Sequence, residues 1–420
     1  MMRTVLRGGL VIDTEPEVVA RPETDVLIED GRIVAVGPNL IADPAAAEVE
    51  VIDATERIVL PGFVDTHRHL WETALRGVAV DADLGVYLEQ VLGRYGARYR
   101  PEDVASGNLV GALECLDAGI TTVQDFSHVQ LSEAHTDAAL DALRTAGIRT
   151  VFGYGPSPLS GAAVNADGLR RVLDRSSERI RFAVAAIGPS FSPLEIVRAD
   201  WELADSLELP VVVHISSSAI AVDPITRLRD AGLLRPNTLY VHGNDLPDSE
   251  LKLIADSGAA VATTPSVEAR MEMGRPLAPR LRSAGVSLSL GVDAVTTVAG
   301  DMFGAMRELL ALGYTTFTAA EVLRIATVDG ARALGLTDVG SLAVGNQADL
   351  ALLRRTDVNL AGGLHDPVAT VVTAAHPGNV DTVLVGGTPV KRDGKLLSAA
   401  LPGALDALAD SVAHLTSPLQ

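Results

Sequence analysis

Two kinds of hydrophobic pattern alternate along most of this chain. From Ile58 onward, short runs of β-branched and other apolar residues are separated by stretches in which apolar residues recur every three to four positions. The runs are typical of buried strands, and the stretches are typical of amphipathic helices. We predict eight strands, at residues 58–65, 120–125, 149–152, 180–186, 210–214, 238–242, 259–263 and 286–291.

The helical stretches lie between these runs, which determines the class of fold. Strands that alternate with helices form parallel sheets with right-handed crossovers. Eight such units predict an α/β fold, a closed (β/α)₈ barrel of the TIM type rather than an open sheet. The helices are expected at residues 102–117, 134–146, 167–177, 194–207, 248–256 and 276–284.

Both ends of the chain have a different, β-rich pattern. The segment "EDGRIVAVG" reads as a hairpin with Asp30-Gly31 at its turn. After a helical stretch at 319–334, "GSLAVGNQADLALL" and "VDTVLVGGTPVKRDGKLL" are short strands separated by glycines. We therefore expect residues 1–56 and 338–420 to form one small β-sandwich domain, and residues 57–337 to form the barrel.

Composition and charge narrow the classes of partner. The chain has 34 Lys and Arg against 54 Asp and Glu, a formal net charge of −20. Such a surface repels phosphate, which disfavours nucleic acid and anionic membranes as partners. Cys115 is the single cysteine, which excludes an internal disulfide and cysteine-ligated zinc and is typical of a reducing compartment. With no apolar run long enough to span a membrane and no signal peptide, we expect a cytoplasmic protein, monomeric or a homo-oligomer.

The residues that end the predicted strands are the candidates for chemistry, because functional groups of such barrels gather at the carboxyl ends of the strands. His67 and His69 end the first strand and, two positions apart, face the same side. His214 ends the fifth strand, His242 the sixth, and Asp293 the eighth.

Each of these groups alone is weak evidence, but their coincidence at one barrel mouth predicts a metal site. Four of the five can ligate a metal and leave one position open for water, which is the arrangement of a catalytic site. A metal makes hydroxide available near neutral pH, an aspartate can take up the proton of the water, and a further histidine can polarise the substrate. Neither a phosphate-binding loop nor a GxSxG motif is present, which argues against nucleotide binding and a serine hydrolase.

The chain resembles the amidohydrolase superfamily, in its cytosine deaminase-like and triazine hydrolase-like branch. The motifs "ERIVLPGFVDTHRHLWETALRG", "AGITTV", "VVVHIS", "VHGN", "LGVD", "ATVDGARALGL" and "GSLAVGNQADLALL" stand in the expected order over nearly the whole chain. The resemblance implies a barrel with a β-sandwich and one divalent metal, zinc most often, with Fe²⁺ or Mn²⁺ as alternatives. It also implies roles for the strand-end residues. The implied metal ligands are His67, His69, His214 and Asp293, with Asp293 also the general base and His242 the histidine that orients hydroxide and substrate.

One departure from the family pattern bears on the reaction. Deaminases of this branch usually carry, three residues after the fifth-strand histidine, a glutamate that moves a proton to the departing nitrogen. Here that position is Ser217, which cannot hold a proton at neutral pH. Glu72, three residues after His69, is a candidate replacement as a catalytic acid, and the alternative is an ion-paired loop residue beside Arg76.

Three further residues are predicted to bind substrate: Trp71, by stacking, His128, at the end of the second strand, and Ser217, as part of a polar pocket. Asp125 is a weaker candidate, and a structural hydrogen bond is the larger alternative.

These observations lead to one prediction of function and two alternatives. We predict a metal-dependent hydrolase of a non-peptide C–N bond, a deaminase or amidohydrolase acting on a small, cyclic substrate. Ser217 motivates both alternatives. In one, the same machinery displaces chloride or thiolate or opens a ring amide, and in the other, a metal-binding barrel has lost hydrolysis.

Overall fold

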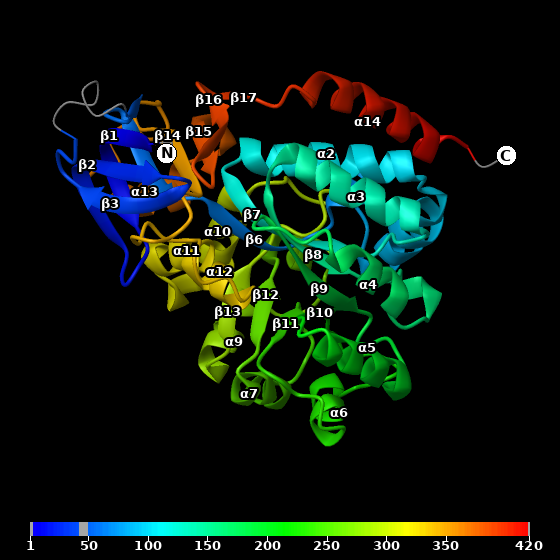
Figure 1. Ribbon diagram of the computed structural model, residues 1–420. Coiled ribbons are helices and arrows are strands. Elements are labelled where there is room, and N and C mark those ends of the chain that lie inside the picture. Colours follow the sequence, from blue (N-terminus) through cyan, green and yellow to red (C-terminus); the bar gives the residue numbers. More distant parts are fainter. Residues whose placement is uncertain (1–2, 42–48, 419–420) are drawn as a thin grey trace. The chain divides into compact units, whose positions relative to one another are not determined.

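The computed structural model describes residues 3–41 and 49–418 (Figure 1). The chain divides into two compact units, and each is built from segments that are distant in sequence. The first unit takes in the residues up to Asp65 together with Leu113–Thr122 and Asp301–Ser398. The second takes in Thr66–Ala112, Val123–Gly300 and the residues from Ala399 onward.

Eight strands form one sheet in their order along the chain, as the hydrophobic runs predict (Figure 1). Their registered pairs are parallel, and an isolated bridge between Arg68 and Asp293 joins the first strand to the residues after the last. The (β/α)₈ barrel is thereby confirmed. The strands are β6 (Phe63–Arg68), β7 (Ile120–Ser127), β8 (Arg149–Tyr154), β9 (Ile180–Ala186), β10 (Val211–His214), β11 (Thr238–Val241), β12 (Ala260–Thr263) and β13 (Ser287–Leu290).

Helices follow these strands, and each buries one face. In α5, for example, Val197, Trp201 and Ala204 are buried at helical spacing. Short helices that begin at proline after β10 and β12, and α10, have no counterpart among the predicted helices. The helices are α2 (Pro101–Asp117), α3 (Glu133–Ala146), α4 (Ala166–Leu173), α5 (Leu194–Ser206), α6 (Pro224–Asp230), α7 (Asp248–Ser257), α8 (Pro265–Arg270), α9 (Ala278–Ala284), α10 (Met302–Leu312), α11 (Ala319–Ile325) and α12 (Val328–Ala333).

Strands from both termini form a second sheet, in the order β17-β16-β15-β14-β5-β1-β2-β3, with β4 paired to β1. The predicted hairpin is confirmed between β2 and β3, with Asp30 and Gly31 both at positive φ, as a tight hairpin turn requires. The strands are β1 (Arg3–Asp13), β2 (Val19–Glu29), β3 (Arg32–Gly37), β4 (Glu50–Asp53), β5 (Arg57–Pro61), β14 (Leu350–Arg354), β15 (Val380–Val385), β16 (Thr388–Arg392) and β17 (Lys395–Leu396).

The predicted first barrel strand, residues 58–65, is in fact two strands in two sheets. β5 pairs with β1 and β14 of the terminal sheet, whereas β6 belongs to the barrel. The chain changes sheets at Gly62, where a Cβ would lie 2.1 Å from Oγ1 of Thr121, so no larger residue fits.

The C-terminal region also contains helices that the β-rich pattern does not predict. They are α13 (Pro367–Ala374) and α14 (Leu401–Thr416). The domain limits expected from the sequence, at residues 56/57 and 337/338, remain a prediction. Within the described residues, no helix combines the length and apolar character needed to cross a lipid bilayer.

Candidate active site

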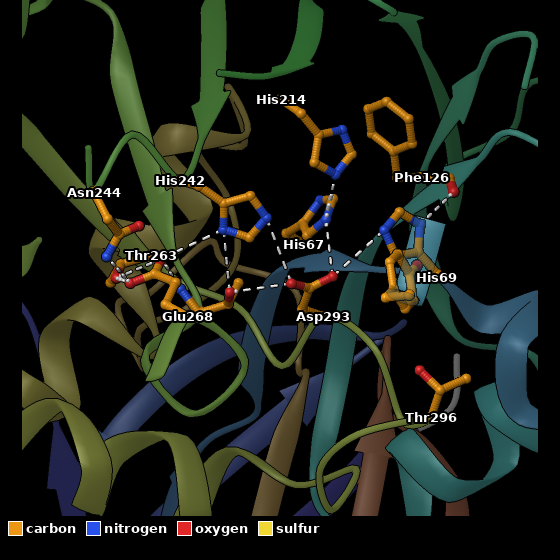
Figure 2. A network of polar contacts seen from close by, with 12 residues as sticks. His67, His69, Phe126, His214, His242, Asn244, Thr263, Glu268, Asp293 and Thr296 are labelled. Atoms are coloured by element: carbon orange, nitrogen blue, oxygen red, sulfur yellow. Dashed lines mark hydrogen bonds and ion pairs between the residues drawn. The ribbon is translucent and has the colours of Figure 1, made fainter. Parts of the chain in front are cut away.

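The five strand-end residues of the sequence prediction meet in the second unit, and their side chains point toward one another (Figure 2). His67 lies within β6 and His69 directly follows that strand; His214 ends β10 and His242 directly follows β11. Asp293 comes three residues after β13. Strand geometry therefore brings together groups that are up to 226 residues apart, since 293 − 67 = 226.

The polar atoms of this cluster lie close enough to share one cation. Oδ1 of Asp293 lies 3.4 Å from Nε2 of His67 and 3.4 Å from Nε2 of His69. Nε2 of His214 lies 3.2 Å from Nε2 of His67. Nε2 of His242 lies 3.5 Å from the other carboxylate oxygen of Asp293. Figure 2 shows these contacts as dashed lines around Asp293.

The outer ring nitrogens of two histidines fix which nitrogen faces the centre. Nδ1 of His69 donates to the backbone carbonyl of Phe126 at 3.0 Å, because a carbonyl oxygen can only accept. Nδ1 of His67 faces the amide oxygen of Gln124 at 3.4 Å. The lone pair of a neutral imidazole then lies on Nε2, toward Asp293, and this is how metal-ligating histidines are held.

The electrostatics of the cluster favour neutral rings at His69 and His214 beside an ionised Asp293. Desolvation, reinforced by the neighbouring His67, lowers the pKa of His69 to about 3. Desolvation also lowers the pKa of His214 well below its usual value. Burial alone would raise the pKa of Asp293, but its close contact with His67 and the electrostatic influence of His67, His242 and His69 together outweigh burial and lower the pKa below its ordinary range. These are the protonation states in which both residue types bind metals.

The donor set fits a divalent metal. Nε2 of His67 and Nε2 of His214 face each other at 3.2 Å beside the Asp293 carboxylate, which is the spacing of imidazole nitrogens that bind one cation. Imidazole and carboxylate together suit zinc, iron or manganese. Three overlapping groups of possible ligands have donor atoms within 4.8 Å of one another: His67, His214 and His242; His67, His69 and Asp293; and His69, Glu72 and His128.

A buried glutamate that the sequence prediction missed orients His242. Oε1 of Glu268 lies 3.4 Å from Nδ1 of His242, and its carboxylate also accepts hydrogen bonds from Thr263, Thr264 and Asn244. Burial would lower the pKa of His242, but the hydrogen bond to Glu268 and the charges of Asp293 and Glu268 together outweigh burial and raise that pKa. The available signal was a lone acidic residue in "TTPSVEAR", just after a strand end.

The backbone is strained at two of the site residues. His242 has a φ of 65° and Asp293 a φ of 72°, a region that residues with a side chain rarely adopt. Such strain gathers at functional sites, where the surrounding structure holds it in place. His242 directly follows β11 and Asp293 comes three residues after β13, so the strained backbone lies at the ends of two barrel strands.

Glu72 is fully buried beside this cluster, rather than exposed in a loop beside Arg76. It lies in a short 3₁₀ helix, Leu70–Leu75, and accepts hydrogen bonds from Tyr87 at 2.5 Å and Thr296 at 3.3 Å. Burial raises the pKa of Glu72 to about 8; the charge of Asp293 adds to this, and the Tyr87 hydrogen bond opposes it. Tyr87, which the sequence prediction missed, lies between Glu72 and the cavity.

The three predicted substrate-binding residues lie in different surroundings. His128 lines the cavity, stacks on His69 with ring centroids 4.5 Å apart, and has no hydrogen-bond partner on either ring nitrogen within the described structure. Trp71 packs behind it, 5.5 Å from the His128 ring. Ser217 donates to the carbonyl of Val222 at 3.0 Å, whereas its neighbour Ser216 lines the cavity.

Asp125 has a structural role. One carboxylate oxygen accepts from the backbone N–H of Leu70 at 3.1 Å, and the other accepts from Asn108 at 3.1 Å. Burial raises the pKa of Asp125 to about 7, although both hydrogen bonds oppose it. Asp125 thus holds the start of the 3₁₀ helix that carries Trp71 and Glu72.

The cluster of histidines and Asp293 opens into a cavity of about 530 Å³ within the second unit. This volume is that of a site for a small molecule. Besides the histidines and Asp293, the cavity is lined by apolar side chains and a few polar ones, which are Leu84, Tyr87, Leu88, Leu92, Phe126, Pro156, Leu159, Ala186, Ile187, Phe191, Ile215, Ser216, Gly243, Asn244, Asp245, Met271, Glu272, Met273 and Gly274.

Comparison with known proteins adds independent evidence to this geometry. A family model described as "Amidohydrolase family" matches residues 58–390. A 5-methylthioadenosine/S-adenosylhomocysteine deaminase from Symbiobacterium thermophilum is 31% identical over 419 residues, and the match covers 94% of each chain.

Two solved structures resemble the whole chain. An adenosine deaminase from Xanthomonas campestris with bound zinc has a TM-score of 0.87 at 26% identity and covers 99% of this chain and 98% of its own. A mutant atrazine chlorohydrolase from Arthrobacter aurescens TC1, complexed with zinc and atraton, has a TM-score of 0.86 at 24% identity and covers 97% of this chain and all of its own. The second likeness bears on the fold alone.

Proposed function

Because this chain belongs to the amidohydrolase family, we propose that it is a single-metal deaminase of a purine nucleoside or a closely similar heterocycle. Family membership makes it a metal-dependent hydrolase of C–N bonds other than peptide bonds, with a small-molecule substrate. The observation that carries the proposal is the convergence of three imidazoles and Asp293 at the end of a substrate-sized cavity. The names of the deaminases it resembles support the choice of substrate class.

His67, His69, His214 and Asp293 would hold the metal, and we propose one ion, zinc. His69 has one lone pair, on Nε2 toward Asp293, because its Nδ1 donates to Phe126. His69 therefore has no second lone pair with which to bind another ion together with Glu72 and His128. The adenosine deaminase with bound zinc supports this choice of metal, and Fe²⁺ or Mn²⁺ would suit the same donors. When bound, such a metal supplies Lewis-acid activation of the attacking water.

Two residues act on the water and the carbon it attacks. Asp293, ionised inside the site, accepts a proton from the water as its oxygen bonds to the ring carbon. His242 lies 3.5 Å from Asp293 and is held by Glu268, so that its Nε2 can donate to the atom on which negative charge develops. The strained backbone at both residues supports this placement.

Glu72 and Tyr87 take the role of the proton-transferring glutamate that is absent at Ser217. Glu72 is held at 2.5 Å by the Tyr87 hydroxyl, and Tyr87 lines the cavity. Glu72 is protonated at neutral pH because its pKa is raised. As the C–N bond breaks, the Tyr87 hydroxyl turns from Glu72 toward the leaving nitrogen, gives it the phenolic proton and takes the Glu72 proton in its place. The proton that Asp293 took from the water then restores Glu72. Water thus supplies its oxygen to the ring carbon, one hydrogen to the departing ammonia and one to the ring, so that atoms and charge balance.

His128 is the substrate contact with the most support. His128 lines the cavity, and its two ring nitrogens are buried without a partner among the described residues, which costs about 1–3 kcal/mol for each polar group. A heterocycle that offers a donor or acceptor there removes this cost. Trp71 would act through His128 by packing behind it, and Ser217 by shaping the loop after β10.

A second candidate keeps the same residues but displaces another leaving group, such as chloride or thiolate or the nitrogen of a ring amide. Ser217 favours it, because groups that depart as stable anions need no proton. The two candidates differ in product rather than in machinery.

Measuring the product distinguishes them. Zinc-loaded protein is incubated with adenosine, 5'-methylthioadenosine, and amino- and chloro-substituted triazines, and ammonia and chloride are measured. Ammonia from the purine nucleosides, at a rate that follows zinc content, is the expected result. Chloride release without ammonia would establish the second candidate. Folded protein that binds no metal after exposure to zinc, iron and manganese would overturn both.

A further inference from the structure

The cavity wall differs between two arcs of the barrel mouth. Since the strands are hydrogen-bonded in the order β6 to β13, the loops after β6, β8 and β9 lie on one arc, and the loops after β11 and β12 lie on the opposite one. All the cavity residues used below belong to the second unit. We call these the apolar arc and the acidic arc.

The apolar arc presents leucines to the cavity at helical spacing. Leu84, Leu88 and Leu92 recur every four residues along the helical segment that runs from α1 (Leu84–Tyr87) into the π-helix Leu88–Tyr95. Leu159 after β8 is 58% exposed and Phe191 after β9 is 39% exposed, and both line the same cavity. Apolar surface left in water costs about 25 cal/mol per Å², so an apolar ligand group that covers these side chains is stabilised.

The acidic arc presents carboxylates. Asp245 follows β11 and Glu272 follows α8, and both side chains line the cavity. Ser216 donates to Asp245 at 2.7 Å and the backbone N–H of Ser217 donates to it at 2.9 Å, which holds this carboxylate at the wall. Among the residues that line the cavity in the described part of the chain, none is lysine or arginine. An anionic group would therefore meet repulsion on this arc and no cation on the other.

We infer that this site selects a substrate that carries an apolar substituent and no carboxylate or phosphate. The apolar substituent packs against Leu84, Leu88 and Leu92, and hydroxyl or amino groups donate to Asp245 and Glu272. The inference rests on the proposed function in taking this cavity as the substrate site. It does not depend on which heterocycle is hydrolysed, and it excludes nucleotides and amino-acid conjugates.

The test compares ligands in pairs that share a heterocycle and differ in the substituent. One pair is 5'-methylthioadenosine and S-adenosylhomocysteine, and the other is an aminotriazine with an N-isopropyl or an N-carboxymethyl group. Calorimetry on zinc-loaded protein gives the dissociation constants, and ammonia release gives kcat/KM. We expect the apolar member of each pair to bind at least about tenfold more tightly, a difference of about 1.4 kcal/mol.

Charge-introducing variants locate the preference on the apolar arc. Leu88→Arg is expected to remove or reverse the preference by weakening the apolar ligand and strengthening the carboxylate. Leu159→Arg, at an exposed position that tolerates a charge, is expected to act in the same direction with a smaller effect. Leu131→Arg is the matched control, because Leu131 is 49% exposed in the same unit and does not line the cavity.

The outcomes separate the two claims. Equal affinities within both pairs, tighter binding of the carboxylates, no binding of either apolar member, or a preference that neither cavity variant alters would overturn the inference. A preference that follows the variants without ammonia from either pair would support the inference while overturning the proposed deaminase.

Discussion

The strand ends of the barrel and the loops beyond them differ in which side chains they bury and which they leave exposed. At the strand ends, His67, His69 and Asp293 are almost completely buried, and their polar atoms face one another. In the loops, Leu159 and Phe191 are large apolar residues left partly exposed around the same cavity. The polar groups at the strand ends contact one another without a substrate, whereas the apolar side chains of the loops would be covered only when a substrate is bound.

The difference teaches where reaction type and specificity reside. Backbone geometry dictates the strand ends, since each strand is hydrogen-bonded to its neighbours and a one-residue shift would turn the histidines away. The loops have no such constraint and can present apolar or acidic walls. The reaction can therefore be inferred from a few positions, whereas the substrate has to be inferred from the whole cavity wall.

The largest expected effect comes from removing the charge at the centre of the strand-end cluster. Asp293→Asn keeps the shape but removes the ligand charge and the proposed base, so we expect turnover to fall about a thousandfold or more and the zinc content to fall with it. Metal analysis and steady-state kinetics measure both. Asp167→Asn, at a side chain that is 98% exposed, is the control. Full zinc content together with wild-type turnover in Asp293→Asn would contradict the proposed ligand set.

A smaller effect is expected where the strand ends meet the loops, at the Glu72 and Tyr87 pair. Glu72→Gln removes the proton source, and Tyr87→Phe removes the group that carries it, so each should lower kcat about a hundredfold. Because both act on one proton path, the double variant should be little worse than either single one. Thr296→Val, which removes the other hydrogen bond to Glu72, is the milder comparison. Unchanged kcat in Glu72→Gln would exclude this path.

The smallest effect concerns stability, in a buried carboxylate that lacks the histidine neighbours of Asp293. Asp200 in α5 accepts one backbone hydrogen bond, from Val164 at 2.8 Å, and burial raises its pKa to about 6. The folded protein therefore holds this proton more tightly than the unfolded chain, whose pKa is near 3.9, and stability falls as the pH rises from about 4 to 6.

Asp200→Asn keeps the acceptor and removes the charge, which makes the difference measurable. At pH 8 the variant should be more stable than the wild type by about 1–3 kcal/mol, and the difference should shrink as the pH falls and approach zero below about pH 4. Urea unfolding at several pH values measures it. A difference that does not change with pH would show that Asp200 keeps an ordinary pKa.

The sequence predicts the barrel and its strand-end chemistry because both follow from short-range patterns. Runs of apolar residues mark the strands, and polar residues at the carboxyl ends of several such runs are expected to gather at the barrel mouth. His67, His69, His214, His242 and Asp293 are therefore found together where the pattern predicts them. The break at Gly62 is missed because it depends on the approach of Thr121, which is distant in sequence.

The supporting residues could not be predicted for a related reason. Glu268 and Tyr87 lie in helical segments after strands, where an acidic or aromatic residue is more often on the surface or in the core. Their contacts with His242 and Glu72 depend on how the loops fold back over the barrel. The helix at the C-terminal end, α14, was missed because an alanine-rich segment after several strands gave no periodic signal that outweighed its neighbours.

The bridge between Arg68 and Asp293 contributes to the closure of the barrel. The backbone N–H of Asp293 donates to the carbonyl of His67 at 2.8 Å, so a proposed metal ligand is itself part of the seam between the first strand and the last. A metal ion held by His67 and Asp293 would connect the first and last strands. Because such an ion binds only the folded barrel, its binding free energy would add to the free energy of unfolding. Metal binding and closure of the barrel would then be coupled.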